Sequence, residues 1–228
     1  MPLNTNLQDE LYDRLSRYCK NHGIPLQPVK AYEAGEYIYR VNSIPMGFYR
    51  LTQGGIKLER EGEPFSSPVI RIINPHEFFG GIGPILQTTC LEDAIVFDEA
   101  EVQLFPKNIF TSLAREDIGF ANFVIKLCCE RINLSEQRIA SLVTLSGKQR
   151  LALFLLGLEY VHDTPPVKAS LHIYLLKKDI ASLIGITPET VSRYLADFEK
   201  KHYIKLHDKS IEIVNRKALL TMGKSRRA

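Results

Sequence analysis

The sequence predicts an α+β protein in three parts: a β-rich N-terminal domain, a long helix, and a C-terminal domain of short helices with a small sheet. From residue 28 to 106, short runs of Val, Ile, Tyr and Phe are broken by Gly, Pro and Asn. Many short strands at this spacing are typical of a sandwich or barrel. From residue 116 to 145 there is no proline and only one glycine, which predicts one long helix. The domains are therefore expected at 1–115, 116–145 and 146–228.

The composition is that of an ordinary globular protein, with 228 residues, 45% hydrophobic and 24% charged. This length suits one large or two modest domains. The N-terminus is polar and has no apolar signal core. No apolar run approaches the roughly 20 residues that a membrane-spanning helix needs. We therefore expect a cytoplasmic protein with no membrane partner.

Apolar residues at helical spacing predict a first helix over residues 7–22, which Gly23 and Pro25 end. These apolar residues are Leu7, Leu11, Leu15 and Tyr18. The strands that follow are predicted at 37–39, 47–51, 56–58, 69–73, 94–97 and 102–105. Turns between them are predicted at 34–36, 53–55, 74–75 and 80–81.

The long helix carries two apolar stripes. One stripe consists of Phe120, Val124, Leu127 and Leu134. The other consists of Ala121, Ile125, Cys128, Ile132, Ile139 and Leu142. A helix with one stripe packs on its own domain, so a second stripe is most simply covered by a second copy of the same helix. We predict a homodimer and assign the first stripe to the dimer interface; the alternative is a helix buried within one chain.

Charge is distributed unevenly along the chain. Residues 1–145 carry 14 Lys/Arg and 18 Asp/Glu, a net charge of −4. Residues 146–228 carry 15 Lys/Arg and 8 Asp/Glu, a net charge of +7. A basic C-terminal part points to a polyanionic partner, and the alternative is a solvated basic face.

Residues 177–202 predict two short helices joined by a tight turn. Residues 177–184 have helical periodicity, and Gly185 supplies the positive φ that a tight helix end needs. Thr187 is a good N-cap, and Pro188 is favoured at the first helical position. Together these features predict a helix-turn-helix whose second helix runs to about His202.

The second helix presents polar side chains near its N-terminal end. Val191, Leu195 and Phe198 recur at i, i+4 and i+7 and should pack inward. Glu189, Ser192 and Arg193 lie on another face, where a recognition helix contacts base edges in the major groove. Arg binds guanine O6 and N7, and Glu accepts from cytosine N4. The alternative is an ordinary ion pair between Glu189 and Arg193, which would contribute about 0.2–0.5 kcal/mol.

A two-stranded wing is predicted after the second helix, with strands at 203–206 and 210–214 and a turn at 207–209. Polar and basic side chains around this assembly are expected to contact DNA phosphates, which set register without reading sequence. These side chains are Lys178, Thr187, Thr190, Lys200, Lys205 and Lys209. Double-stranded DNA is therefore the predicted partner.

The whole chain resembles the CRP/FNR family of bacterial regulators. The closest resemblance lies in residues 175–214, above all in ITPETVSR at 186–193, and Gly147–Ala152 resembles the helix that opens the family's DNA-binding domain. The N-terminal resemblance rests on strand order, Gly54-Gly55 and residues 78–80. The resemblance implies a jelly-roll-like β-roll of the cyclic-nucleotide-binding-domain fold, a dimerisation helix and a winged helix-turn-helix.

The reading residues resemble those of the FNR type more than the CRP type. The resemblance implies palindromic half-sites such as TTGAT or TTGAC, in which Arg193 reads the guanine and Glu189 reads the opposite strand. It also implies RNA polymerase as a partner if the protein is an activator. Switching would come from a signal at the β-roll that shifts how two long helices pack.

The cofactor motifs of the family are altered. Cyclic-nucleotide members have Phe-Gly-Glu and then Arg-Ser/Thr-Ala; here residues 79–81 read FGG and residues 90–94 read CLEDA. A buried phosphate without a cation is costly, so the sequence argues against cyclic AMP. With only Cys19 near the N-terminus, it also argues against an iron–sulfur cluster.

Other sensor chemistries rest on isolated residues. Haem is an alternative, because some family members that respond to nitric oxide or carbon monoxide bind it; here it would depend on His22 or His76. Redox sensing at Cys19 or Cys90 has weak support, because neither cysteine has an obvious cationic neighbour in the sequence that would stabilise a thiolate. Cys128 and the adjacent Cys129 are expected to be small apolar packing residues. A small organic ligand, or none, fits the sequence equally well.

An enzyme is the competing class of function. A cupin-like metal enzyme shares the β-barrel pattern but needs clustered His ligands, whereas the two His residues of this region are more than fifty residues apart. No GxSxG, P-loop or GxGxxG motif is present. We therefore predict a DNA-binding transcription regulator and no metal site.

Overall fold

The computed structural model describes residues 5–62, 67–159, 170–172, 176–207 and 210–224. Lys209, in the wing turn expected at 207–209, lies outside these residues. The chain divides into two compact units, 2–133 and 134–228. The long helix α4 (Ile118–Thr144) contributes to both units. Within the described residues, every helix is too short or too polar to cross a membrane.

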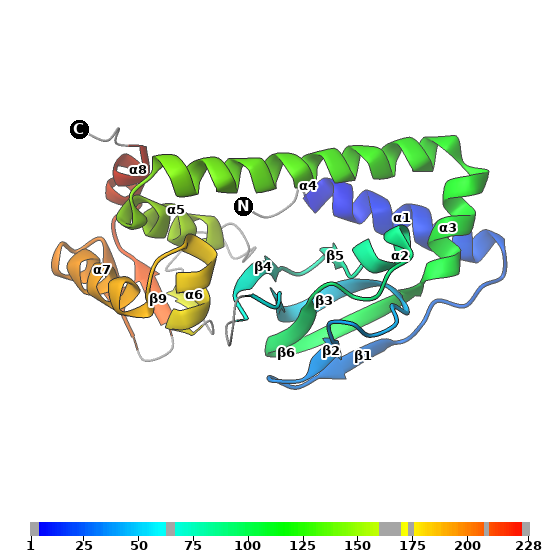
Figure 1. Ribbon diagram of the computed structural model, residues 1–228, viewed down its shortest axis with the longest axis horizontal. Helices are drawn as coiled ribbons and strands as arrows, with labels where there is room; N and C mark the ends of the chain where they lie inside the picture. Colours follow the sequence, from blue (N-terminus) through cyan, green and yellow to red (C-terminus); the bar gives the residue numbers. More distant parts are fainter. Residues whose placement is uncertain (1–4, 63–66, 160–169, 173–175, 208–209, 225–228) are drawn as a thin grey trace. The chain divides into compact units, whose positions relative to one another are not determined.

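The N-terminal unit is an antiparallel sheet accompanied by helices (Figure 1). The strands pair in the order β1-β6-β3-β4, with β2 also on β6 and β5 also on β3. Before α4, the elements in chain order are α1 (Thr5–Asn21), β1 (Val29–Tyr32), β2 (Tyr37–Tyr39), β3 (Gly47–Glu59), β4 (Val69–Ile73), β5 (Phe78–Phe79), α2 (Ile82–Leu86), β6 (Asp93–Pro106) and α3 (Lys107–Glu116).

Two long strands form the centre of this sheet, where the sequence predicted four short ones. β3 and β6 pair along most of their length, with register shifts near residues 51–56. The predicted turn at 53–55 is wrong because the chain continues through these shifts as a bulged strand. Gly54 has φ +86°, and a Cβ there would overlap the carbonyl oxygen of Glu99. In the sequence, a glycine that permits such a close approach cannot be distinguished from a glycine in a turn.

The long helix predicted at 116–145 is confirmed as α4, and a shorter helix, α3, precedes it. α3 was not predicted, and it ends where Asp117 adopts an extended conformation. The Asp117 carboxylate then accepts a hydrogen bond from the Phe120 backbone N–H at 3.1 Å, which caps the start of α4. One face of α4 packs with α1 and α3 in a core that includes Phe110 and Phe120, whose ring centroids are 5.2 Å apart.

The C-terminal unit is a group of helices with a three-stranded antiparallel sheet in the order β7-β9-β8. After α4, its elements are α5 (Gly147–Glu159), β7 (Ser170–His172), α6 (Lys177–Ile184), α7 (Pro188–Lys200), β8 (Ile204–Leu206), β9 (Ser210–Ile213) and α8 (Arg216–Lys224). The α+β class is confirmed, and so are the two short helices and the two-stranded wing.

Candidate nucleic-acid interface

The turn between α6 and α7 has the conformation that the sequence predicted. Gly185 ends α6 with φ +66°, and its N–H donates to the carbonyl of Ala181. A Cβ at Gly185 would lie 2.7 Å from the Leu142 side chain, so glycine is required by both backbone conformation and space. This turn sets the direction of α7 relative to α6.

The N-terminal end of α7 is capped by side chains. Thr187 is extended, and its hydroxyl accepts a hydrogen bond from the Thr190 backbone N–H at 3.3 Å. Pro188 begins the helix. The pKa of the exposed Glu189 carboxyl is lowered because its own backbone N–H and the Thr187 hydroxyl donate hydrogen bonds to it. A negative charge here also suits the helix dipole.

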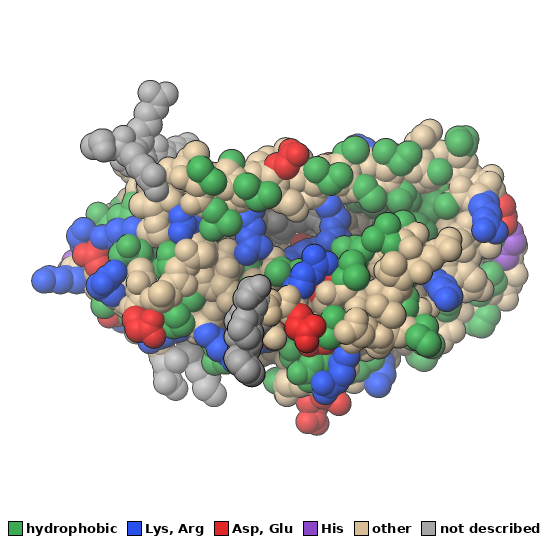
Figure 2. Space-filling view, in the orientation of Figure 1, with side chains coloured by type: hydrophobic (Ala, Val, Ile, Leu, Met, Phe, Trp, Pro, Cys, Tyr) green, Lys and Arg blue, Asp and Glu red, His purple; other side chains and the backbone are tan. Residues whose placement is uncertain are grey.

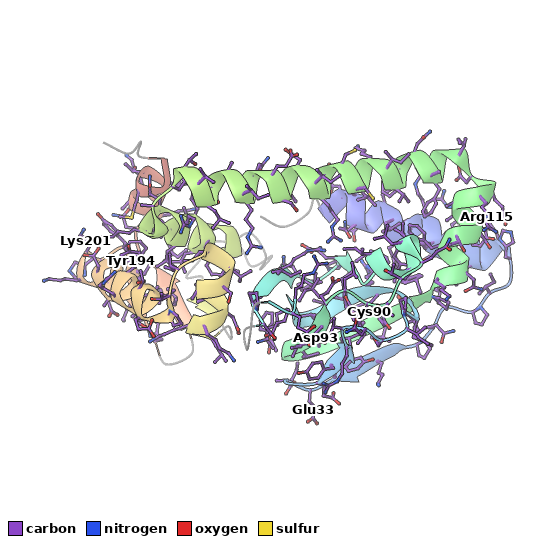
Figure 3. The ribbon with its side chains drawn as sticks, in the orientation of Figure 1. Glu33, Cys90, Asp93, Arg115, Tyr194 and Lys201 are labelled. Carbon is purple, nitrogen blue, oxygen red and sulfur yellow. The ribbon has the colours of Figure 1, made fainter. Side chains whose placement is uncertain are left out.

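The two faces of α7 differ as predicted in burial. Val191, Leu195 and Phe198 are buried in the core of the C-terminal unit. Glu189 and Arg193 are exposed. No ion pair joins them in the described chain, so the i, i+4 pair that a merely solvated helix would form is not made. The Arg193 guanidinium instead lies 5.6 Å from the ring centroid of Tyr194, which Figure 3 labels on α7.

Ser192 differs from its two neighbours on the reading face. Its side chain is half-buried, and the hydroxyl donates to the Pro188 carbonyl at 3.1 Å. A hydroxyl bonded to its own helix retains lone pairs for a further contact. Ser192 can therefore accept a hydrogen bond from a base or a water without leaving this position.

Basic side chains lie on α7 and on the elements next to it. Lys178 in the first turn of α6, Lys200 at the end of α7 and Lys205 in β8 are exposed. The wing is tied to α7 because the Glu199 carboxylate accepts a hydrogen bond from the Leu206 N–H at 2.8 Å. The predicted phosphate-contacting lysines thus lie on three elements that are joined around one recognition helix.

Arg150 is a structural residue of this unit that the sequence analysis did not identify. Its guanidinium donates to the carbonyls of Leu142 at 3.2 Å, Leu145 at 2.6 Å, Ile184 at 2.6 Å and Gly185 at 3.0 Å. One cation therefore satisfies the carbonyl ends of both α4 and α6, where helix dipoles favour positive charge. Arg150 couples the end of α4 to the turn that sets the direction of α7.

The stripe assigned to dimerisation is mostly buried within its own chain. Phe120 and Leu127 belong to the N-terminal core, Val124 packs against that core, and Leu134 is half-buried. The assignment of Phe120 and Leu127 to an interface is wrong because α1 and α3 already cover this face. The other stripe remains exposed, and hydrophobic side chains recur along α4 in Figure 2.

The sensor residues singled out in the sequence are engaged in ordinary contacts. The His22 Nδ1 lies 2.9 Å from the Tyr18 carbonyl oxygen, and the His76 Nδ1 lies 2.9 Å from an Arg50 nitrogen. Cys19 and Cys90 are buried, and burial raises the pKa of both thiols. Figure 3 labels Cys90 among the strands of the N-terminal unit.

The other two cysteines correct the sequence interpretation. Cys128 and Cys129 are exposed on α4, so neither packs in the core of its own chain as the sequence led us to expect. Adjacent residues on a helix point about 100° apart. Neither cysteine lies on the face of α4 that packs in the N-terminal core. Within the described residues, no three His, Cys, Asp or Glu side chains are grouped to hold a metal ion.

A cluster of charged side chains lies inside the N-terminal unit. Arg71 and Glu77 form an ion pair at 2.6 Å, and a carboxylate oxygen of the buried Glu92 lies 3.6 Å from Arg60. Burial, and to a smaller extent the neighbouring Arg71, lower the pKa of Arg131 to about 10, although Glu77 and Glu92 act in the opposite direction. The cluster is close to charge-balanced and carries no strong net positive charge.

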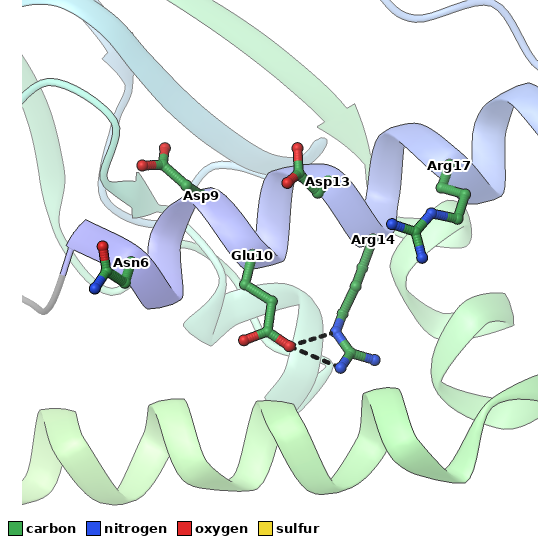
Figure 4. A pocket seen from close by; sticks show the side chains of 6 residues that line it. All are labelled: Asn6, Asp9, Glu10, Asp13, Arg14 and Arg17. Atoms are coloured by element: carbon green, nitrogen blue, oxygen red, sulfur yellow. Dashed lines mark hydrogen bonds and ion pairs between the residues drawn. The ribbon is translucent and has the colours of Figure 1, made fainter.

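A polar groove of about 370 Å³ runs along α1 (Figure 4). Its lining is charged, and a Glu10 oxygen pairs with Arg14 at 2.7 Å. The lining residues are Asn6, Asp9, Glu10, Asp13, Arg14 and Arg17. Three acidic and two basic side chains line it, so the groove offers no single charge to a ligand.

Comparison with known proteins matches both units. The Crp-like helix-turn-helix domain matches residues 149–222, and the Cyclic nucleotide-binding domain matches residues 29–117. The Global nitrogen regulator of Synechococcus elongatus is 26% identical over 86% of this chain and 89% of its own. The chain belongs to the CRP/FNR family. The CRP-like cAMP-activated global transcriptional regulator of Mycobacterium tuberculosis is 23% identical to this CRP/FNR regulator over 82% of this chain and 84% of its own.

Solved structures share the fold of this CRP/FNR regulator. FixK2 from Bradyrhizobium japonicum has a TM-score of 0.78 at 18% identity, covering 89% of this chain and 100% of that chain. The CRP/FNR-family regulator TTHA1359 from Thermus thermophilus has a TM-score of 0.71 at 22% identity, covering 88% and 100%. The protein is a DNA-binding transcription regulator and not an enzyme, as the sequence predicted.

Proposed function

We propose that this CRP/FNR regulator binds, as a homodimer, a palindrome with TTGAT-like or TTGAC-like half-sites. The observation that carries the proposal is the pair of exposed, mutually unpaired side chains Glu189 and Arg193 at the N-terminal end of α7. Arg193 would donate two hydrogen bonds to guanine, and the ionised Glu189 would accept from cytosine N4 on the other strand. Ser192 would make an adjacent contact.

Phosphate contacts would hold this reading head in register. Lys178, Lys200 and Lys205 are exposed around α7 and would each neutralise a backbone phosphate. Thr187 and Thr190 lie at the N-terminus of α7, where a helix end attracts anions. Lys209, outside the described residues, is proposed for the same role from its place in the wing turn.

The second recognition helix would come from a second copy of the chain. The exposed stripe of α4 supports this, because a long apolar stripe is usually covered by a partner. A signal at the N-terminal unit would change how two α4 helices pack, and Arg150 would pass that change to the α6–α7 turn. If the bound dimer activates transcription, RNA polymerase is its further partner.

Cyclic AMP is not the effector that we propose, although the relative from Mycobacterium tuberculosis is named as cAMP-activated. Glu92 lies in the segment that would hold the cyclic phosphate by resemblance, and its carboxylate is buried. A buried carboxylate repels a phosphate, and the neighbouring arginines already face Glu77 and Glu92.

Excess cyclic AMP is therefore expected to leave the Kd for the operator unchanged within about twofold. Fluorescence anisotropy measures this Kd. A tenfold decrease in Kd, which corresponds to about 1.4 kcal/mol, would contradict the prediction.

Fluorescence anisotropy on labelled duplexes tests the proposed site. One duplex carries the palindrome with half-site centres about 34 Å apart, which is one helical turn. The matched control has the same half-sites separated by a further five base pairs, so that they lie on opposite sides of the duplex. At one salt concentration, a dimer should bind the first duplex at least about tenfold more tightly. Equal affinity for the two duplexes would contradict a dimer that reads both half-sites.

A further inference from the structure

The exposed stripe of α4 has a strict seven-residue repeat. Ile118, Ile125, Ile132 and Ile139 recur at this spacing, and each is between 58% and 79% exposed. Ile at every first heptad position is the pattern of a coiled-coil seam. The residues three positions after each Ile fill the second seam position; they are Ala121, Cys128, Ser135 and Leu142. None of these eight residues is charged, whereas charged residues occur on both sides of the seam.

The opposite side of α4 is already covered by its own chain. Phe120, Phe123 and Leu127 are buried in the N-terminal core. The four isoleucines of the seam therefore stay exposed in the described chain. Pairing the seam with a copy of itself would remove on the order of 1,000 Å² from water, which is the lower limit for a biological interface. A second copy of this chain is the one partner certain to carry a matching heptad.

The direction of pairing follows from the proposed function, on which this inference rests. The DNA-binding domain follows the C-terminal end of α4 in every copy. Two half-sites about 34 Å apart require both recognition helices at the same end of the dimer. An antiparallel pair of α4 helices would separate those ends by about 40 Å more, at 1.5 Å per residue. The pair is therefore parallel, and equivalent residues face each other across its axis.

We propose that, in the parallel pair of α4 helices that this dimer requires, Cys128 faces the partner's Cys128 and the two thiols form an intersubunit disulfide under peroxide. Cys128 is exposed in the single chain and occupies the second seam position between Ile125 and Ile132. Cys129 is equally exposed but lies one position outside the seam. The neighbouring seam residues Ala121 and Ser135 are small, which lets the two helices approach closely.

The chemistry balances with one molecule of hydrogen peroxide. The Cys128 thiolate attacks the peroxide O–O bond, forming a sulfenic acid and releasing one water after protonation. The partner's Cys128 thiolate then attacks the sulfenic sulfur, forming the S–S bond and releasing a second water. Two thiols are oxidised and one peroxide is reduced. A dithiol reductant reverses the reaction by exchange.

Non-reducing electrophoresis of the full-length protein tests this inference. The protein is treated with hydrogen peroxide, the remaining thiols are blocked with N-ethylmaleimide, and the fraction at twice the 25.9 kDa chain mass is measured. Most of the wild type and of Cys129→Ser should cross-link, and Cys128→Ser should lose the cross-link at least about tenfold. Loss of the cross-link in Cys129→Ser but not in Cys128→Ser would overturn the proposed register.

A second pair of variants tests the seam without Cys128. In a Cys128→Ser background, Ser135→Cys restores a thiol at the next second seam position, and Gln137→Cys places one outside the seam. The Ser135→Cys variant should cross-link and the Gln137→Cys variant should not; the reverse result would overturn the proposal.

Sedimentation distinguishes failure of the proposed homodimer from failure of the Cys128 pairing. A monomer would contradict the proposed homodimer, whereas a dimer that binds the palindrome without cross-linking at Cys128 would contradict only this pairing.

Discussion

Arg193→Ala is expected to abolish the preference for the palindrome over a scrambled duplex. A bidentate contact from Arg to guanine contributes about 1–3 kcal/mol of discrimination, so the specific Kd should rise roughly 10-fold to 100-fold. The affinity for scrambled DNA should change little, because that affinity depends on phosphate contacts. In the described part of the chain the Arg193 side chain is exposed and its guanidinium lies 5.6 Å from the centroid of the Tyr194 ring, so its removal should leave stability unaffected.

Lys200→Ala is the matched control for this measurement. Lys200 is exposed on the same helix but at its C-terminal end, away from the reading face. Its loss should weaken binding to both duplexes equally and reduce the salt dependence by about one phosphate contact. Anisotropy titrations at several salt concentrations separate the two patterns. If Arg193→Ala weakened both duplexes by the same factor, Arg193 would be a phosphate contact and not the guanine-reading residue.

Phe120→Ala is expected to destabilise the N-terminal unit by about 3–5 kcal/mol. The ring is fully buried and packs edge-to-face on Phe110, which in turn stacks on Phe48 at 4.0 Å. Removing it leaves a cavity between α4 and the β-strands that the surrounding aromatic rings cannot close. Urea denaturation at one fixed protein concentration measures the loss, because the stability of a dimer depends on concentration.

Ile125→Ala makes the complementary change on the exposed stripe of the same helix. Its side chain is 60% exposed in the single chain, so the variant should keep the fold but raise the dimer dissociation constant in sedimentation. Phe120→Ala should do the reverse, with less folded protein and an unchanged dissociation constant for the folded fraction. An interface role for the buried stripe would instead make Phe120→Ala dissociate the dimer at wild-type stability.

The DNA-binding half of the fold was predictable because its determinants are local. The positive φ of Gly185, the N-cap at Thr187 and the buried face of α7 each depend on residues within a few positions of one another. Local chemistry of this kind is readable without knowing the tertiary structure. The residues proposed to read bases were placed on the exposed face of that helix in the same way, because positions relative to the buried face are set by 3.6 residues per turn.

The long strands were not predictable in the same way. A glycine pair in the middle of β3 has the composition of a turn, yet its partner β6 continues alongside it. Whether Gly54 turns the chain or lets a neighbouring strand approach closely depends on Glu99, which is 45 positions away. The same limit applies to Arg150, whose four carbonyl partners lie at two helix ends that only the folded chain brings together.

The sequence alone determined that α4 has two apolar stripes, because periodicity places residues on faces. Which stripe belongs to the core was decided only by the tertiary structure, since α1 and α3 cover Phe120 and leave Ile125 exposed. Sequence periodicity places residues on a helix face but does not say which other helix or strand packs against that face. Cys128 is exposed for the same reason, because the other face of α4 packs in the core. The exposed seam of α4 therefore depends on the tertiary structure and not on periodicity alone.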